Sequence, residues 1–367
     1  MVPHDSGPVI VVMAGGTGGH IFPALATAAE LESRGYRVHW LGTPGSMEAD
    51  LVPRHGFEIS FIPITGVRGK KMLYWLKAPW LIGKSILKAM ALLREQKPVC
   101  VLGMGGYVTG PGGVAAKLLG IPLVIHEQNA IPGLTNKLLS SLATKVLEAF
   151  PGTFSGKKFK KVKRKLFTTG NPVRSSIASE NDYHAGKSLK LLVIGGSRGA
   201  VAINKLIPQL LARYKGGLDI WHQTGKNNID DCLSDYRKLE ADDIKSYKVE
   251  PFIDDMAQAY EWADIVLCRS GALTVSELAV AGRPAILVPF PYAVDDHQTA
   301  NGRYLTDNGA AVMIQQDQLD EEALTTLLMS LGRDPARLQS MAAAAKSVGR
   351  SRATREVADH CLEVCHG

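Results

Sequence analysis

The sequence predicts two α/β domains, each built on a parallel sheet, and three observations support this fold class. The chain has 367 residues, which is too long for one ordinary core and suits two domains of about 150 to 200 residues each. Short apolar runs alternate with helical patterns, as in buried parallel strands joined by crossover helices. The series strand, glycine-rich turn, helix also occurs twice, at an offset of 180 residues.

The first domain begins with the apolar run Val9–Met13, which predicts a strand buried on both faces. A glycine-rich turn follows at residues 15–20, and a helical pattern covers about residues 23–33. Further strands are predicted at 37–41, 99–104, 123–126 and 145–149.

The second domain restarts the pattern with the strand Leu189–Ile194, a turn at residues 195–200 and a helix to about Tyr214. Later strands are predicted at residues 264–268 and 285–289, and the tail from about Leu319 is predicted to be helical. Between the two domains lies the segment 151–165, in which seven of the last nine residues are Lys or Arg, and we interpret this segment as a solvated linker.

Composition narrows the classes of function. The chain is 46% hydrophobic and 21% charged, as in ordinary folded proteins. Its net charge of +7 favours an anionic partner, which could be a nucleic acid, an anionic membrane or a phosphorylated substrate. The five cysteines form no C-x-x-C pair, and neither a signal peptide nor an apolar stretch of membrane-spanning length is visible. We therefore expect idle thiols and a cytoplasmic protein.

Three glycine-rich loops follow predicted strands of the first domain, at residues 15–20, 103–107 and 110–113. Glycine lets the backbone approach an anion closely, and a helix N-terminus adds unpaired N–H groups and a favourable dipole. Ligands of open α/β sheets bind at the carboxyl ends of the strands. The loops indicate a phosphate or pyrophosphate site, unless the glycines serve tight turns alone.

Two common nucleotide motifs do not fit these loops. The dinucleotide pattern G-x-G-x-x-G, read from Gly16, places Ile21 at its last position, and no acidic residue ends the strand at 37–41. Neither domain's first loop has the Gly-Lys-Ser/Thr ending of a P-loop. Both observations weaken the dehydrogenase and NTPase interpretations.

The sharpest signal in the second domain is CRSGALTVSE at residues 268–277, where a strand ends in a small-residue turn and a helix begins. The N–H groups of the first helical turn could hold a diphosphate, while the carboxylate of Glu277 could accept both hydroxyls of a ribose. The alternative is a capping pattern with Glu277 solvated or complementing the dipole. The polar loop at 289–301 could read a sugar by its hydroxyls, or Asp296 could cap a helix there.

Together these segments resemble the MurG family, the N-acetylglucosaminyltransferases of peptidoglycan synthesis, over essentially the whole chain. The motifs are, in order, AGGTGGH at 14–20, GMGGY at 103–107, HEQN at 126–129, GNPVR at 170–174, GGSRGA at 195–200, FIDDM at 252–256, CRSGALTVSE at 268–277 and DDHQTAN at 295–301. Other two-lobed nucleotide-sugar enzymes share only the glycine loops and the ribose-binding acid. One departure is Arg198, where the family carries Gln.

The resemblance implies the GT-B architecture, two Rossmann-like domains facing a cleft, with a last helix that crosses back. The first domain, residues 1–168 plus about 346–367, would bind the acceptor, and the second, residues 169–345, would bind the donor. The implied reaction moves N-acetylglucosamine, with inversion, from UDP-N-acetylglucosamine to the C4 hydroxyl of the muramoyl sugar in the undecaprenyl-pyrophosphoryl pentapeptide, converting lipid I to lipid II. The implied location is peripheral, on the cytoplasmic face of the bacterial inner membrane. Other cell-wall synthesis proteins are candidate partners, and nucleic acid is not.

Residue roles follow from the matching positions. Glu277 would bind the ribose hydroxyls, the backbone of Ile253 would read the uracil edge, and Gln298, with Asp296 nearby, would contact the sugar hydroxyls. The diphosphate would be held by Ser197, Ala272, Leu273 and Thr274. The substrate site would be completed by Thr17, Gly18, Gly19, Asn129, Arg174, Val275 and Ser276.

Inversion requires a single displacement in which the deprotonated acceptor hydroxyl attacks C1 as UDP leaves, so a general base must stand near that hydroxyl. His20 is the first candidate, because an unperturbed imidazole titrates near neutral pH, although a lone His is often structural. Glu127 is the second candidate. The chain has no D-x-D triplet, so we expect no obligatory metal ligands and no cofactor.

Residues 68–97 carry eight basic residues and one acid, Glu95, and predict a membrane-facing patch. Counted from Trp80, the positions Ile82, Ile86, Met90 and Leu93 form a stripe at helical spacing that we expect to pack inside the domain. The expected membrane patch consists of Trp75, Leu76, Trp80, Leu81, Lys84 and Lys88. Its apolar centre, ringed by lysines, suits an anionic inner-membrane surface better than nucleic acid, and the alternative is that the whole segment packs inside.

Two other functions stay open at this point. One is another two-lobed sugar-nucleotide enzyme, either an epimerase or a transferase with a different acceptor. The other, of a different class, is a non-enzymatic basic protein that binds membranes or RNA.

Overall fold

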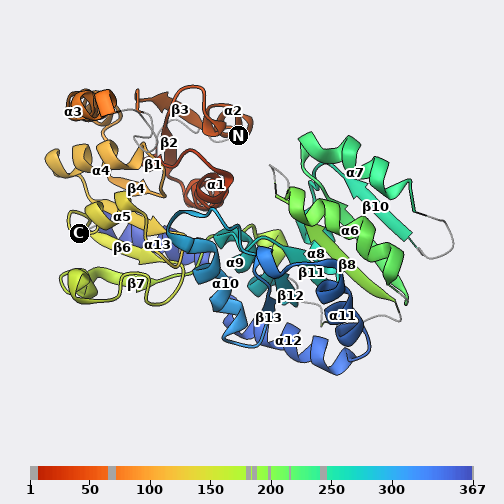
Figure 1. The fold of residues 1–367 in the computed structure, drawn as a ribbon. Helices are drawn as coiled ribbons and strands as arrows, with labels where there is room; N and C mark the ends of the chain where they lie inside the picture. Colours follow the sequence, from red (N-terminus) through yellow and green to blue (C-terminus); the bar gives the residue numbers. More distant parts are fainter. Residues whose placement is uncertain are drawn as a thin grey trace. The chain divides into compact units, whose positions relative to one another are not determined.

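The structure, a computed structural model, describes residues 7–64, 72–178, 183, 188–196, 200–214, 216–239 and 246–365, apart from the side chains of residues 72–78 and Val294. The chain divides into two compact units: unit 1 comprises Met1–Arg174 and Arg352–Gly367, and unit 2 comprises Ser175–Ser351. Each unit is a parallel α/β domain (Figure 1), which confirms the predicted fold class.

Over the described ranges, the sheet of unit 1 has seven parallel strands in the order β3-β2-β1-β4-β5-β6-β7. The strands are β1 (Val9–Met13), β2 (Arg37–Gly42), β3 (Glu58–Phe61), β4 (Cys100–Gly103), β5 (Leu123–Glu127), β6 (Lys145–Glu148) and β7 (Leu166–Thr168). The order of the strands reverses between β1 and β4. The loops after these two strands therefore border the crevice in which ligands of such sheets bind.

The helices of unit 1 cover both faces of this sheet. They are α1 (Gly18–Ser33), α2 (Met47–Arg54), α3 (Met72–Gln96), α4 (Thr109–Leu118), α5 (Leu134–Leu139) and α13 (Ala353–Cys365). Alternate side chains of β1 point to opposite faces: Ile10 and Val12 join the core under α1 and α13, while Val11 and Met13 join the core under α3 and α4. This alternation explains why the run in β1 is apolar throughout.

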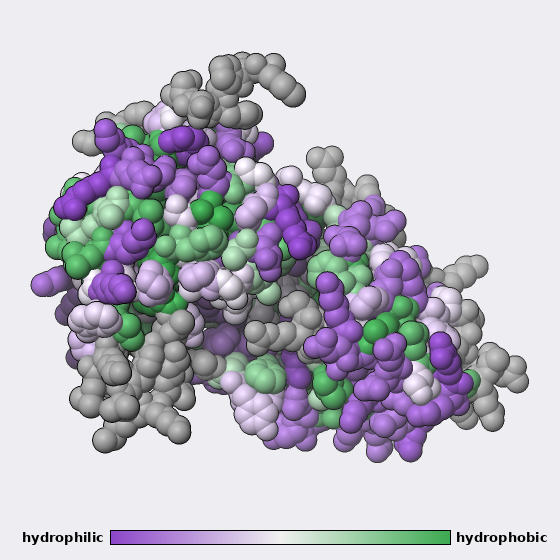
Figure 2. All heavy atoms as spheres, turned by 90° about the horizontal axis from the view of Figure 1, so that it is seen from above, coloured by the Kyte–Doolittle hydropathy of each residue, from purple (hydrophilic) through white to green (hydrophobic). Residues whose placement is uncertain are grey.

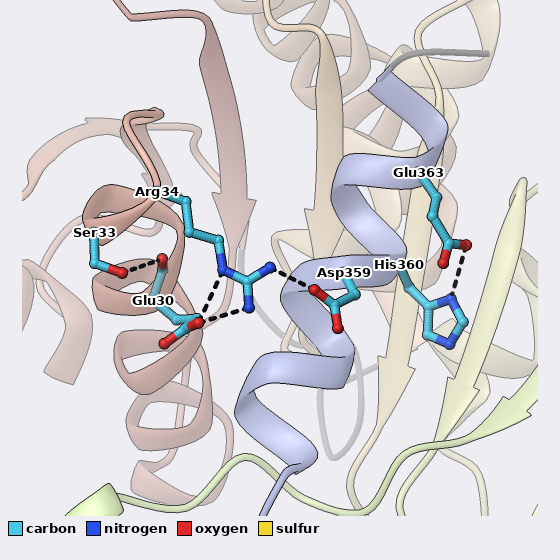
Figure 3. A network of polar contacts seen from close by, with 6 residues as sticks. All are labelled: Glu30, Ser33, Arg34, Asp359, His360 and Glu363. Atoms are coloured by element: carbon cyan, nitrogen blue, oxygen red, sulfur yellow. Dashed lines mark hydrogen bonds and ion pairs between the residues drawn. The ribbon is translucent and has the colours of Figure 1, made fainter.

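Helix α13 joins unit 1 although it follows all of unit 2 in the chain. Its residues Val357, Ala358 and Cys361 are buried in the core shared with α1 and β1. At the surface, the Arg34 guanidinium at the end of α1 pairs with Asp359 of α13 and with Glu30 of its own helix (Figure 3). One ion pair, between Arg34 and Asp359, and an apolar seam thus fix the last helix to the first.

The buried carboxylate of Glu48, on α2, holds the loop after β1. Its Oε2 accepts a hydrogen bond from the Gly16 N–H at 3.1 Å, and its Oε1 accepts one from the Thr43 N–H at 3.1 Å. A β-carbon on Gly15 would lie 2.4 Å from Oε1, and one on Gly42 would lie 2.9 Å from Cγ. The two glycines therefore leave the space that the Glu48 side chain fills.

Unit 2 repeats the arrangement with the strand order β10-β9-β8-β11-β12-β13 over the residues described, again all parallel. Its strands are β8 (Leu189–Ile194), β9 (Leu218–Gln223), β10 (Ser246–Glu250), β11 (Ile265–Cys268), β12 (Ala285–Leu287) and β13 (Ala311–Met313). Its helices are α6 (Val201–Arg213), α7 (Ile229–Tyr236), α8 (Met256–Trp262), α9 (Ala272–Ala281), α10 (His297–Thr306), α11 (Glu321–Gly332) and α12 (Pro335–Val348). The order reverses between β8 and β11, so the second crevice lies at the loops after these strands.

The interpretation of residues 157–165 as a solvated linker is wrong. Within this segment Val162 is buried in the core of unit 1, and the Phe159 ring packs edge-on against Phe154 with centroids 5.3 Å apart. The segment leads into β7, which pairs with β6. The two apolar residues pack onto the domain, the Lys165 ammonium donates to the carbonyl oxygens of Ser141 and Ala143, and most of the other cations stay exposed.

The first helix begins at Gly18, five residues before the start predicted from the apolar pattern. Thr17, with an extended backbone (φ −136°, ψ 154°), occupies the N-cap position. Glycine disfavours helix interiors, and for this reason the pattern alone placed both glycines in the loop. They form the first turn instead, and the predicted ligand loop is correspondingly shorter.

A buried histidine in unit 2 is held neutral. His222 on β9 has Nε2 3.2 Å from Oδ1 of Asn204 and Nδ1 3.0 Å from the Tyr236 hydroxyl. Because the Asn204 oxygen can only accept, Nε2 carries the proton and Nδ1 accepts from Tyr236. Burial lowers the pKa of His222 to about 3.

We predict that Glu48→Ala lowers the free energy of unfolding by about 3 kcal/mol, because it removes the acceptor of the Gly16 and Thr43 N–H groups and leaves a cavity where the buried side chain was. Glu48→Gln should cost less, since it keeps the shape and one acceptor oxygen. Chemical denaturation measures both. Asp50→Ala, at an exposed position of the same helix, is the control, and equal midpoints for Glu48→Ala and Asp50→Ala would contradict the clamp.

We also predict that stability falls as the pH drops below the unfolded-state pKa of His222, about 6.5. The folded pKa is depressed, so between pH 6.5 and about 3 the unfolded chain binds the extra proton. From pH 7 to pH 5 this residue should cost about 2 kcal/mol. Urea unfolding at several pH values, followed by tryptophan fluorescence, should show a smaller pH dependence in His222→Gln, and an unchanged slope would refute the assignment.

Candidate active site

The loop after β1 presents the first turn of α1 at the crevice of unit 1. Gly16 and Thr17 are exposed, Gly18 and Gly19 are the first helical residues, and the first turn of α1 contains no acidic side chain. The N-terminus of a helix has unpaired N–H groups and a partial positive charge. The sequence-predicted residues Thr17, Gly18 and Gly19 are thus brought together in an arrangement suited to an anion.

His20 lies in this first turn, and its surroundings define its tautomer. Its Nδ1 is 3.2 Å from the Gly15 carbonyl oxygen and 3.4 Å from Oγ1 of Thr17. A carbonyl oxygen only accepts hydrogen bonds, so Nδ1 carries the proton and the neutral ring has its lone pair on Nε2. A base in this tautomer can take a proton at Nε2.

The loops after β1 and β4 touch so closely that side chains are excluded between them. A β-carbon on Gly106 (φ +86°) would lie 2.5 Å from the Gly15 carbonyl oxygen, and one on Gly105 (φ +101°) would lie 2.9 Å from Nε2 of His20. Both glycines also adopt the left-handed backbone that other residues avoid. The second glycine loop therefore packs directly against the first loop and the imidazole.

Glu127, the second candidate base, ends β5 and is buried. Its Oε1 accepts hydrogen bonds from the backbone N–H and the side-chain amide of Asn129, at 3.1 and 3.2 Å. Its Oε2 accepts from the Gly133 N–H at 3.0 Å and from Nδ2 of Asn136 at 2.9 Å. Both oxygens are thus engaged within the loop after β5, and the carboxylate fixes the orientation of Asn129.

In unit 2 the segment 268–277 forms the predicted strand, turn and helix. Helix α9 begins after Gly271 and has no side-chain cap at its N-terminus. Glu277, in its second turn, is 7% exposed, and its Oε2 accepts a hydrogen bond from the Tyr260 hydroxyl at 3.0 Å. This burial excludes the alternative of a solvated capping residue.

The other predicted residues of α9 divide into two groups. Leu273 and Thr274 are partly exposed, whereas Ala272, Val275 and Ser276 are buried. The Ser276 hydroxyl donates to the Ala272 carbonyl within the helix, at 2.9 Å. The side chains of Val275 and Ser276 are thus engaged inside the unit.

The loop before α10 carries backbone strain. Asp295 (φ 54°) and Asp296 (φ 50°) are successive non-glycine residues in the left-handed region, a conformation that costs about 1–3 kcal/mol each and concentrates at functional sites. Asp296 stands at the N-cap position of α10, but its carboxylate accepts from the Thr299 hydroxyl, at 2.7 Å, instead of capping the backbone. Gln298 accepts from the Phe290 N–H at 2.8 Å through Oε1, which directs the amide nitrogen away from that loop.

For three further predicted residues, the structure gives little or no detail of side-chain contacts. Ile253 is buried in the loop before α8, and Arg174 is an exposed residue at the end of unit 1. Ser197 lies outside the described residues, as does Arg198. The neighbouring Gly196 has φ +76°, close to the +89° of Gly16 at the matching position of unit 1.

Sequence reasoning missed three residues that shape these loops. Glu48 supports the loop after β1, Tyr260 donates to Glu277, and Arg269 donates to the carbonyls of Val288 and Pro289, at 3.1 Å each. Glu48 and Tyr260 belong to no recognisable local pattern, because each contacts a segment distant in sequence. Arg269 lies within the motif at 268–277, but that pattern does not record its contact with the segment after β12.

The predicted membrane patch is partly exposed. Trp80 is 68% exposed, and Nζ of Lys84 lies 5.6 Å from the centre of its ring. Lys88 is exposed and Leu81 half-buried, while the side chains of Trp75 and Leu76 lie outside the described residues. The predicted buried stripe is wrong at one position, since Ile82 is 40% exposed. Leu93 is buried as predicted, but the other buried positions, Ser85 and Ala89, come one residue before the predicted Ile86 and Met90, which are half-buried against the core.

The described residues meet neither the requirements of a metal site nor those of a membrane-spanning helix. No three His, Cys, Asp or Glu side chains among them are grouped so as to hold a metal ion. None of the helices within the described ranges combines the length and apolar character needed to cross a membrane. The cysteines are free thiols, four of them buried.

The chain is similar to known glycosyltransferases over both units. Residues 10–148 match the glycosyltransferase family 28 N-terminal domain, and residues 190–357 match the C-terminal domain of the same family. A protein of Pseudomonas fluorescens strain Pf-5, named UDP-N-acetylglucosamine--N-acetylmuramyl-(pentapeptide) pyrophosphoryl-undecaprenol N-acetylglucosamine transferase, is 50% identical over 98% of this chain and 100% of its own length. A protein of the same name from Stutzerimonas stutzeri strain A1501 is 50% identical over 98% of this chain and 99% of its own.

Solved structures agree with these matches. The crystal structure of Acinetobacter baumannii MurG has a TM-score of 0.81 and 41% identity, covering 97% of this chain and 99% of that one. A UDP-N-acetylglucosamine 2-epimerase, at 14% identity and a TM-score of 0.64, shares the fold alone. The chain therefore belongs to glycosyltransferase family 28 and, within it, to the MurG family whose motifs its own sequence carries.

Proposed function

We propose that the chain moves N-acetylglucosamine, with inversion, from UDP-N-acetylglucosamine to the C4 hydroxyl of the muramoyl sugar in the undecaprenyl-pyrophosphoryl pentapeptide, converting lipid I to lipid II in peptidoglycan synthesis. Unit 2 binds the donor and unit 1 binds the acceptor. The curated relatives of the same name match this chain at 50% identity along nearly its full length. An epimerase is not favoured, because that similarity reaches only the fold.

The observation that carries the donor half is the buried carboxylate of Glu277 in the second turn of α9. The Tyr260 hydroxyl donates a hydrogen bond to this carboxylate. The N-terminus of the same helix has no side-chain cap. In this proposal the ribose hydroxyls donate to Glu277 while the diphosphate binds at the first turn, with Leu273, Thr274 and Ser197 nearby. The backbone of Ile253 reads the uracil, and Gln298 binds the sugar.

In the acceptor half, the helix N-terminus at Thr17, Gly18 and Gly19 binds the acceptor's pyrophosphate. His20 removes the proton of the C4 hydroxyl at Nε2, that oxygen forms a bond to C1, and the bond from C1 to the β-phosphate oxygen breaks with its electrons on UDP. The tautomer fixed by Gly15 supports this role for His20. Glu127 positions Asn129, and Arg174 completes the site.

We place the protein peripherally on the cytoplasmic face of the inner membrane, where its lipid acceptor is made. The exposed Trp80 with Lys84 and Lys88 supports contact with an anionic surface, to which each lysine contributes about 1 kcal/mol. Other cell-wall synthesis proteins are natural neighbours there. The proposal needs no nucleic acid partner.

We predict that Glu277→Gln weakens UDP binding at least tenfold, since a hydrogen bond to a charged group contributes about 1.5–3 kcal/mol. Calorimetry with UDP and with its 2′,3′-dideoxy analogue isolates the ribose contact: wild type should lose affinity for the analogue, and the variant should not distinguish the two ligands. Glu322→Gln, at an exposed position of α11, is the control. A variant that still discriminates between the ligands would disprove the ribose role.

We predict that His20→Gln lowers kcat by about 10²–10⁴ while leaving the KM for UDP-N-acetylglucosamine nearly unchanged, because a general base acts on the chemical step. The acidic limb of the pH profile of kcat/KM should disappear with it. His55→Gln, on the exposed end of α2, is the matched control. Retention of the acidic limb in His20→Gln would assign the proton transfer to another group.

A further inference from the structure

Unit 1 contains an apolar groove next to the proposed acceptor loops. Its cavity of about 530 Å³ lies between α3, the start of α4 and α5, and the segments after β2 and β3 close its end. Ser85 is among its few polar lining residues, and its hydroxyl lies 2.9 Å from the carbonyl oxygens of both Pro63 and Leu81. The groove therefore offers a ligand mainly hydrocarbon surface.

Large apolar side chains stand exposed along this groove. Leu134 is 64% and Leu138 66% exposed, and since they are four residues apart on α5 they share one face. Tyr107 is 55% and Ile82 40% exposed on the other sides. Figure 2 shows hydrophobic surface gathered on the part of unit 1 that carries α3 and α4, with hydrophilic side chains bordering it. A contiguous exposed apolar patch of this kind marks a binding site for an apolar partner.

The groove begins where the proposed pyrophosphate loops end. Tyr107 directly follows Gly106, which touches Gly15 of the first loop, and Gly110 and Pro111 of the same segment line the groove. A pyrophosphate bound at the first turn of α1 would thus have the mouth of an apolar channel beside it. The acceptor named for the relatives joins a pyrophosphate to a polyisoprenoid alcohol, and this chemistry matches a polar loop followed by an apolar groove.

From this juxtaposition we infer that the groove binds the isoprene units nearest the pyrophosphate of the lipid-linked acceptor. The inference rests on the proposed function and adds that the enzyme reads the lipid part of its substrate, not only the sugar and peptide. The occupant is the substrate's own chain, not the acyl chains of bulk lipid. Charge supports this orientation, because the exposed lysines Lys84, Lys88 and Lys137 flank the groove's helices and suit the anionic side of a membrane from which the chain emerges.

The test compares two acceptors with the same pyrophosphoryl-muramoyl pentapeptide head, one bearing four isoprene units and one bearing a methyl group, in solution without vesicles. We expect Leu138→Glu to raise the KM for the tetraprenyl acceptor at least tenfold and to leave the KM for the methyl acceptor and for UDP-N-acetylglucosamine unchanged. Leu118→Glu is the matched control: Leu118 is 64% exposed on α4 but does not line the groove. It should behave like wild type with both acceptors.

Several outcomes would overturn the inference. They are an unchanged tetraprenyl KM in Leu138→Glu, an equal rise for the methyl acceptor, or an equal effect of Leu118→Glu. Loss of flotation on vesicles without polyprenyl lipid, with an unchanged tetraprenyl KM, would assign the groove to bulk lipid instead. Leu138 and Leu118 are both exposed, so these two variants should fold. Leu134→Glu, at another exposed position of the groove, provides a second test.

A binding experiment separates this inference from the proposed function. Calorimetry with geranylgeranyl pyrophosphate needs no transfer reaction, and its affinity should fall at least tenfold in Leu138→Glu but not in Leu118→Glu. If wild type transfers no sugar to either acceptor but binds this probe in a Leu138-dependent way, the proposed function fails and the groove assignment stands. If transfer proceeds and the probe binds equally to all variants, only the groove assignment fails.

Discussion

The close contact between two glycine loops of unit 1, which leaves no room for side chains, is the constraint on which the proposed acceptor site depends. Neighbouring parallel strands β1 and β4 bring their following loops to the same edge of the sheet, and Gly15 and Gly106 come within the space of a single methyl group. This contact exposes the first turn of α1 and places the imidazole of His20 beside the second loop. Glu48 then holds the first loop from behind through the Gly16 N–H. The backbone of the first loop is thus held from two sides.

The proposed donor site of unit 2 uses a different arrangement. The helix N-terminus at Gly271 has no side-chain cap, and the buried carboxylate of Glu277 lies in the second turn of the same helix. Burying a carboxylate is costly unless it is hydrogen-bonded, and Tyr260 meets part of that need. The left-handed backbone of Asp295 and Asp296 in the loop before α10 costs stability, as is common at functional sites.

Local patterns were sufficient to predict what depends on neighbouring residues, and they failed for what depends on distant ones. The apolar runs of β1 and β8 marked the two central strands to the residue, because strands buried on both faces leave continuous apolar stretches. The short strand β7 follows a cationic segment in which Val162 and Phe159 pack onto the core, so composition misled there. The contacts of Glu48, Tyr260 and Arg269 could not be predicted, since each of these side chains bonds to a segment that is distant in sequence. Of the predicted site, the glycine loops and the buried acid of α9 were accessible because their chemistry lies in contiguous residues.

The position of α13 has a consequence for how the protein is made on the ribosome. The strands of unit 1 emerge first, yet the apolar surface formed by Ile10, Val12 and α1 receives Val357, Ala358 and Cys361 only after every residue of unit 2 has been synthesised. Throughout that interval this apolar surface of the nascent unit 1 stays uncovered by α13. Unit 2, being continuous in sequence, can fold while unit 1 waits, so a molecular chaperone has a defined surface and a defined time window in which to act.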